Sequence, residues 1–135
     1  MSPAPHFHAV LWIDHAHARI AFFSADDARL FEFRSHGDPH VHHKAGVIGS
    51  GHATADPVFL AALAAALAEA GEILVCGPGA AKSEFARHLE THAPALRRRV
   101  IAVEPLDQAT DGELVDHARR FFKIADRKTP QRPGR

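Results

Sequence analysis

This 135-residue chain has one cysteine, a formal net charge of zero and no long apolar run. The single cysteine, Cys76, excludes a framework of intrachain disulfides. The longest Ala-rich stretch, 58–70, is shorter than the roughly 20 apolar residues of a membrane-spanning helix. The first twenty residues lack a basic segment followed by an unbroken apolar one, so we expect no signal peptide. These absences predict a cytosolic protein with no membrane partner.

Charge is balanced overall but unevenly placed. Residues 1–70 hold four Lys/Arg against seven Asp/Glu, whereas residues 71–135 hold twelve against nine. From Arg119 onward there are seven basic residues and a single acidic one, Asp126. A basic end of this kind either contacts nucleic acid or another acidic partner, or is simply solvated.

The first third of the chain has the pattern of an antiparallel meander. Apolar, strand-forming runs occupy residues 9–14, 18–24 and 28–34, and the connectors between them have the length of hairpin turns.

After residue 55 the apolar residues recur at helical spacing. Asp56-Pro57 is a strong helix start, and the apolar positions continue at helical spacing until Gly71.

The remaining elements alternate between strand and helix. We expect a strand at 72–76, a helix at about 80–92, a strand at 100–104, and a helix opened by the capping box at 110–113. The order β-β-β-α-β-α-β-α predicts one α/β domain, residues 1–127, with ribonuclease H-like topology. Its mixed five-stranded sheet would have the order 3-2-1-4-5 and be flanked by three helices. Residues 128–135 are predicted to form a disordered basic tail.

The segment between residues 35 and 55 is the most unusual part of the sequence. It contains four glycines and five of the twelve histidines: His36, His40, His42, His43 and His52. Connections this long are uncommon in compact domains and are usually functional or disordered. Three interpretations stay open: the histidines, with Asp38, bind a divalent metal such as zinc; the segment contacts RNA, with Lys44 meeting phosphate; or it is solvated and has no ligand.

Two segments, residues 10–22 and 73–89 (ILVCGPGAAKSEFARHL), resemble the middle domain of archaeal and eukaryotic class-one peptide release factors and of Pelota. Over residues 8–125 the chain is similar to short bacterial proteins called translational machinery proteins. The resemblance implies the same fold and a role at the ribosome or on tRNA. In release factors, the loop corresponding to residues 35–55 carries the Gly-Gly-Gln motif. Here it has no adjacent glycine pair and no glutamine, so the resemblance implies no peptide-release activity and no catalytic residue.

Basic side chains are the candidates for phosphate contact that follow from this resemblance. They are Lys44, Lys82, Arg97, Arg98, Arg99, Arg119, Arg120 and Lys123, together with the tail residues Lys128, Arg132 and Arg135. The alternative is a solvated rim, in which the cations late in the last helix are favoured by the helix dipole.

Three further features have a structural interpretation beside a functional one. Residues 77–83 (GPGAAKS) follow a strand and open a helix, as a phosphate-binding loop does, but the loop is too short and Ala81 precedes Lys82. A tight turn that packs the helix onto the sheet is the simpler interpretation. Asp14 ends the first strand, where a nuclease would place a metal ligand, but it more simply caps the hairpin. The aromatic side chains expected in the core are Trp12, Phe22, Phe23, Phe31 and Phe33.

The sequence therefore predicts a non-enzymatic, cytosolic accessory protein that binds the ribosome or tRNA. A metal-binding or metal-responsive module that uses the histidines of residues 35–55 is the alternative. A structural or self-associating domain without a nucleic-acid role is the third hypothesis.

Overall fold

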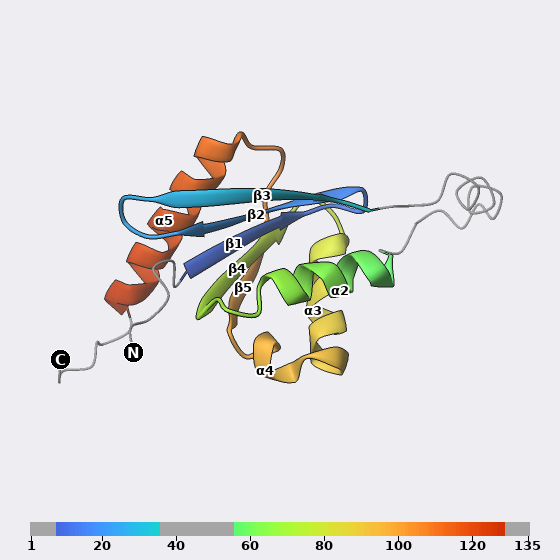
Figure 1. Ribbon diagram of the computed structural model, residues 1–135. Helices are drawn as coiled ribbons and strands as arrows, with labels where there is room; N and C mark the ends of the chain where they lie inside the picture. Colours follow the sequence, from blue (N-terminus) through green and yellow to red (C-terminus); the bar gives the residue numbers. More distant parts are fainter. Residues whose placement is uncertain (1–7, 36–55, 129–135) are drawn as a thin grey trace.

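The computed structural model describes residues 8–35 and 56–128, in which strands and helices alternate as Figure 1 shows. The strands are β1 (His8–Ile13), β2 (His17–Phe23), β3 (Ala28–Arg34), β4 (Glu72–Gly77) and β5 (Val100–Pro105). The helices are α2 (Pro57–Ala66), α3 (Ala81–His92), α4 (Pro94–Arg97) and α5 (Asp111–Lys128). The predicted element order is confirmed, with the short helix α4 added between α3 and β5. The predicted tail was residues 128–135. Lys128 belongs to α5, and residues 129–135 lie outside the described residues.

The five strands form one mixed sheet in the order β3-β2-β1-β4-β5, as the sequence predicted. β1 pairs antiparallel with β2 and parallel with β4, and β4 pairs parallel with β5. β1 lies at the centre, and its residues Ala9–Ile13 are fully buried. A central strand covered on both faces requires such a continuous apolar run, which explains why HAVLWI does not alternate.

The helices cover the two faces of the sheet unequally. Figure 1 shows α2, α3 and α4 on one face and α5 alone on the other. Two apolar clusters correspond to these two layers. The larger one joins β1, β2 and β4 to the helices α2, α3 and α4 through Phe59, Leu63, Leu67, Phe85, Leu89 and Leu96. The smaller one joins Val10, Trp12, Leu74 and Cys76 to Leu114, Ala118 and Phe122 of α5.

Both predicted helix starts are present. The Asp56 carboxylate accepts a hydrogen bond from the Val58 amide at 3.0 Å, as an N-cap should. At the start of α5, the Thr110 hydroxyl accepts from the Glu113 amide, and the Glu113 carboxylate accepts from the Thr110 amide. These reciprocal bonds confirm the capping box. α2 ends at Ala66, earlier than the predicted end at Gly71.

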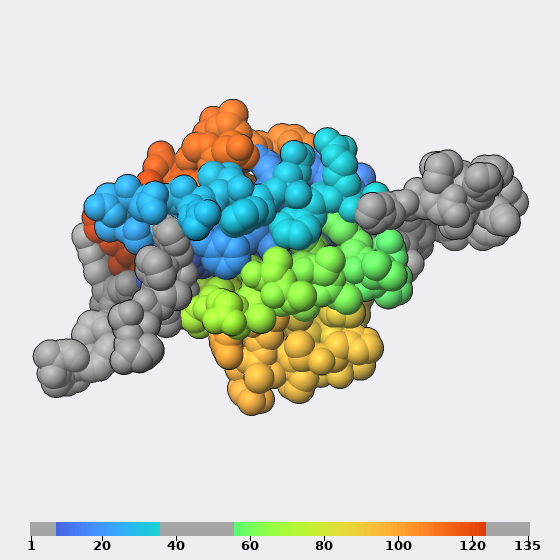
Figure 2. All heavy atoms as spheres, in the orientation of Figure 1, coloured from blue at the N-terminus to red at the C-terminus, as the bar shows by residue number. Residues whose placement is uncertain are grey.

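Phe31 is not a core residue, contrary to the prediction. Its side chain is 44% exposed, and its neighbour Leu30 is 36% exposed. β3 is an edge strand that pairs only with β2, and in Figure 2 it crosses the visible surface between α5 and α2. The helix layer reaches Phe22 and Phe33, which are partly buried against the larger cluster. Phe31 lies beyond that cover, with its ring edge-to-face against Phe22 at 5.9 Å.

Among the helices of residues 8–35 and 56–128, none has both the length and the apolar composition needed to cross a bilayer.

Candidate nucleic-acid interface

The segment that links β3 to α2 begins at the carboxyl edge of the parallel strands. β3 runs in the same direction as β1, because each is antiparallel to β2. The Ser35 amide, just after β3, donates to the Ala16 carbonyl at 2.9 Å in the β1–β2 turn. Lys44 and the histidines at 36, 40, 42, 43 and 52 lie outside the described residues. Metal binding and RNA contact by this segment therefore stay predictions.

Asp14 caps the β1–β2 turn, as expected. One carboxylate oxygen, Oδ1, accepts hydrogen bonds from the amides of Ala16 and His17, both at 2.8 Å. The same oxygen lies 3.4 Å from the His17 ring nitrogen Nδ1. The side chain therefore satisfies turn amides that would otherwise lack a partner.

The turn after β4 brings two backbones into close contact. Gly77 has a φ of +156°, and a Cβ at this position would lie 2.1 Å from the carbonyl oxygen of Ile13 at the end of β1. Only glycine allows this approach without movement of a central strand. Lys82, in the first turn of α3, donates its ammonium to the Gly79 carbonyl. Its charge is therefore directed back to its own loop, in agreement with a tight turn.

Four of the predicted phosphate-contacting cations are already bonded within the chain. Lys82 is one of them, and Arg97 lies with its Nε 3.4 Å from the Glu90 carboxylate. Arg99 donates from Nη1 to the carbonyls of Ala68 and Ala70, at 2.8 and 3.0 Å. Those carbonyls follow the last turn of α2, so Arg99 attaches the end of α2 to the start of β5.

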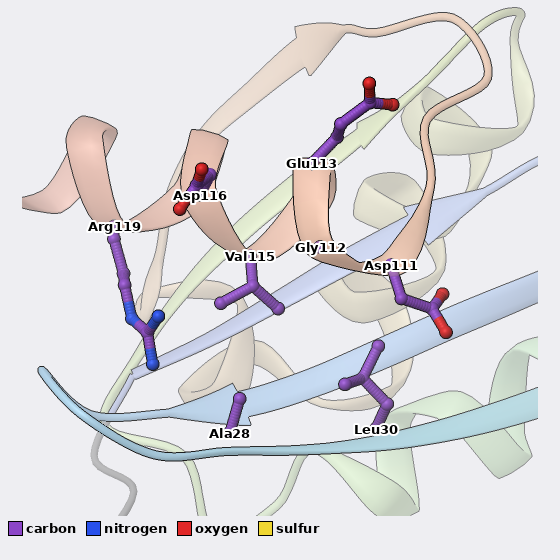
Figure 3. A pocket seen from close by; sticks show the side chains of 8 residues that line it. All are labelled: Ala28, Leu30, Asp111, Gly112, Glu113, Val115, Asp116 and Arg119. Atoms are coloured by element: carbon purple, nitrogen blue, oxygen red, sulfur yellow. The ribbon is translucent and has the colours of Figure 1, made fainter.

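Arg119 is the fourth, and it closes the β2–β3 turn. Its Nε donates to the Ser24 carbonyl at 3.0 Å, and its Nη2 donates to the Asp27 carbonyl at 2.9 Å. An open groove of about 490 Å³ lies between α5 and β3, and Arg119 is one of the residues that line it. In Figure 3, Arg119 lies at one end of these residues and Val115 points toward the strand. The carboxylates of Glu113 and Asp116 point away from the strand in the same view. Arg119 thus acts on the chain's own backbone.

The remaining predicted cations with described side chains are Arg98, Arg120 and Lys123. They are exposed and have no partner among the side chains of residues 8–35 and 56–123. Arg98 immediately precedes β5, at the amino edge of the parallel strands. Lys123 follows Phe122, whose ring lies 4.4 Å from that of His8 at the start of β1. All three therefore lie toward the same edge of the sheet, Arg98 on the α4 side and the other two on α5.

Substitution of a bonded cation should lower the free energy of unfolding more than substitution of a free one. Arg99→Ala removes a guanidinium that two carbonyls share, and we expect it to lower the free energy of unfolding by about 1–2 kcal/mol. Arg98→Ala removes a free charge one residue away and should change it by less than about 0.5 kcal/mol. Urea unfolding followed by circular dichroism measures both variants. Equal stability of the two would show that the Arg99 contacts contribute nothing.

Several polar contacts had no signal in the sequence, because their partners are distant along the chain. Arg19 donates to the Asp111 carboxylate at 2.9 Å and stacks over the Trp12 ring at 5.0 Å. The Trp12 indole donates to the carbonyls of Leu106 and Asp107, at 3.1 and 3.2 Å. Together these contacts attach the β5–α5 loop to the carboxyl edge of the sheet.

Histidines paired with carboxylates recur over the surface. His8 lies 3.0 Å from Glu72, His15 lies 3.4 Å from Glu84, and His117 lies 3.0 Å from Glu104. Each pair joins two different segments of the fold. In the described ranges, no three or more His, Cys, Asp or Glu side chains converge as metal ligands would.

Cys76 is buried in β4, as expected. Burial, followed by the negative charge of Glu104, raises the pKa of the thiol to about 12. The Sγ atom lies 3.5 Å from the Leu11 carbonyl, to which the thiol donates. The thiol is therefore protonated at neutral pH, and it is neither a nucleophile nor a ready metal ligand.

Comparison with known proteins identifies relatives of the fold only. No protein-family model and no curated protein matches the sequence. Pelota from Archaeoglobus fulgidus is similar in structure, with a TM-score of 0.52 and 17% identity over 84% of this chain. The archaeal translation termination factor aRF1 has a TM-score of 0.54 and 15% identity over 90% of this chain. Dom34 from S. cerevisiae has a TM-score of 0.58 and 9% identity over 89% of this chain. It is a translation termination-like factor involved in RNA quality control pathways and interacting with Hbs1.

The chain has the fold of a release-factor-like α/β domain, which confirms the predicted architecture. It spans 30% of the Pelota chain, 41% of aRF1 and 35% of Dom34, so it corresponds to less than half of each. At these identities the likeness establishes the shared fold, and function has to be argued from the site.

Proposed function

We propose that the chain is a non-enzymatic, cytoplasmic, translation-associated protein that binds the ribosome or tRNA, and that it belongs with the bacterial translational machinery proteins. The observation that carries the proposal is the fold, shared with Pelota, aRF1 and Dom34. Two of these, aRF1 and Dom34, are described as a translation termination factor and a termination-like factor. The divergent segment 36–55 is the reason to separate this chain from peptide-release activity.

The exposed cations supply the phosphate contacts in this proposal. Arg98, Arg120 and Lys123 have no partner among the described side chains (residues 8–35 and 56–123), so their charges can replace counterions on RNA. The bonded cations Lys82, Arg97, Arg99 and Arg119 are assigned to the fold instead. Among the described side chains, this assignment narrows the predicted phosphate-contacting set to Arg98, Arg120 and Lys123, with Lys44 as a further candidate.

The position of the free cations suits a large RNA surface. They lie toward the amino edge of the sheet, whereas the segment beginning after Ser35 leaves the carboxyl edge. A strand of six residues separates the two edges by about 20 Å. Contacts at both edges require a partner at least that long, which fits an RNA and not a small ligand.

Fluorescence anisotropy with labelled tRNA and with ribosomal RNA fragments tests the proposal. We expect binding whose log K falls linearly with log salt, with a slope of about 0.9 per phosphate contact on duplex RNA by analogy with B-DNA. A labelled polyanion without bases, such as heparin, shows whether the RNA is recognised beyond its charge. The absence of salt-dependent binding to either RNA would contradict the proposal.

A further inference from the structure

His88 and His92 lie one turn apart on the same side of α3. Their ring centroids are 4.5 Å apart, and the ring planes are inclined by 37°. Side chains at positions i and i+4 of a helix are neighbours, so the helix itself holds the two rings together.

This pair differs from the other described histidines in its surroundings. His8, His15, His17 and His117 each lie within 3.4 Å of a carboxylate oxygen. The rings of His88 and His92 lie next to each other, and neither has a hydrogen bond or ion pair to another described side chain. Their nitrogens are therefore available to an external ligand.

The spacing of the rings matches two imidazoles bound to one metal ion. A coordinating nitrogen lies about 2.1 Å from the metal and about 1.1 Å from the centre of its ring, so each centroid would lie about 3.2 Å from the ion. Two centroids 4.5 Å apart then subtend an angle near 90° at the metal. Adjacent positions of tetragonal Cu²⁺ or octahedral Ni²⁺ have this angle, whereas tetrahedral zinc requires a wider one.

Solvent can reach the pair. His88 is half-buried. His92 is exposed at the end of α3 and leaves the approach open to solvent.

We propose that His88 and His92 form a two-histidine binding site for a divalent transition-metal ion of the Cu²⁺ or Ni²⁺ class. The helix supplies two adjacent ligands. Because no third His, Cys, Asp or Glu among the described residues joins them, water or a ligand from another molecule completes the coordination. This site uses none of the histidines of residues 36–55 and does not depend on the translation-associated function.

Copper held by iminodiacetate is a suitable probe, because the chelator leaves adjacent coordination positions for two histidines. The protein is the full chain in which the histidines at 36, 40, 42, 43 and 52 are replaced by Gln, so that those positions cannot compete. In ¹H–¹⁵N NMR spectra, substoichiometric probe should broaden the amide signals of α3 by paramagnetic relaxation. The additional substitution His88→Gln should abolish that broadening.

A register control distinguishes chelation from binding by single histidines. The double variant Arg87→His/His88→Gln keeps the number of histidines but places them at i and i+5, on different sides of the helix. We expect no selective broadening of α3 in this variant. Broadening that survives in either variant, or α3 signals that persist with the parent protein, would overturn the proposal.

Thermal unfolding with Ni²⁺ gives a second test. A metal that binds the folded helix but not the unfolded chain should raise the Tm by several degrees at saturation. His88→Gln should have the parent Tm without metal and no shift with it. Equal Ni²⁺ shifts in the two proteins would also count against the site.

Discussion

Replacing Gly77 by alanine is expected to lower the stability of the domain by about 3 kcal/mol. The added Cβ would lie 2.1 Å from the Ile13 carbonyl oxygen, and the φ of +156° is one that side-chain-bearing residues rarely adopt. Ile13 belongs to β1, the central strand, so relief of the clash requires movement of β1 or β4. The cost therefore falls on the parallel pairing at the middle of the sheet.

Thermal unfolding by circular dichroism measures this effect as a fall in Tm of about 10 °C or more. Gly79→Ala is the matched control, because a Cβ there meets nothing within 4 Å and the residue lies only two positions away. We expect the control to keep its Tm within about 2 °C of the parent. A Gly77→Ala protein as stable as the Gly79→Ala protein would show that the two backbones are not in close contact.

The triple variant Arg98→Ala/Arg120→Ala/Lys123→Ala is expected to lose most of its RNA affinity while keeping its stability. Each cation that contacts a phosphate contributes about 1 to the slope of log K against log salt. Removal of three should therefore reduce the slope by about 3 and weaken binding to different RNA sequences alike. Fluorescence anisotropy across a salt series measures both quantities.

A second triple variant, Arg34→Ala/Lys82→Ala/Arg87→Ala, changes the net charge equally at a different place. Arg34 ends β3 and Lys82 lies in the first turn of α3, both at the carboxyl edge of the sheet, and Arg87 is exposed in the middle of α3. We expect the salt slope of this control to stay close to that of the parent. Equal losses in the two triple variants would attribute RNA binding to overall charge and refute the assigned surface.

The fold was predictable because each boundary has a local cause. Connectors of hairpin length define β1 to β3, and the caps at Asp56 and Thr110 begin α2 and α5 through bonds to amides within three residues. The two missed features have different causes. α4 is a helix of only four residues. α2 ends before Gly71, and the distant side chain of Arg99 holds the chain after its last turn.

The same distinction explains what the sequence could not predict about the candidate site. Eight basic residues were equivalent in the sequence, but the carbonyl partners of Arg119 lie 92 and 95 positions away, and those of Arg99 lie 29 and 31 away. Only the folded chain separates cations that hold its backbone from those that are free. The exposure of Phe31 has a similar cause, because an alternating strand does not reveal where the helix layer stops.

Sedimentation of the tagged protein through sucrose gradients of a cell lysate is the most direct test of a translation-associated function. At low salt the protein should travel with ribosomal particles and return to the top fractions as salt is raised. The Arg98/Arg120/Lys123 variant should remain near the top under all conditions. A wild-type protein that stays with free soluble proteins even at low salt would contradict ribosome binding. If anisotropy also detects no tRNA binding, the fold would be all that this chain shares with Pelota, aRF1 and Dom34.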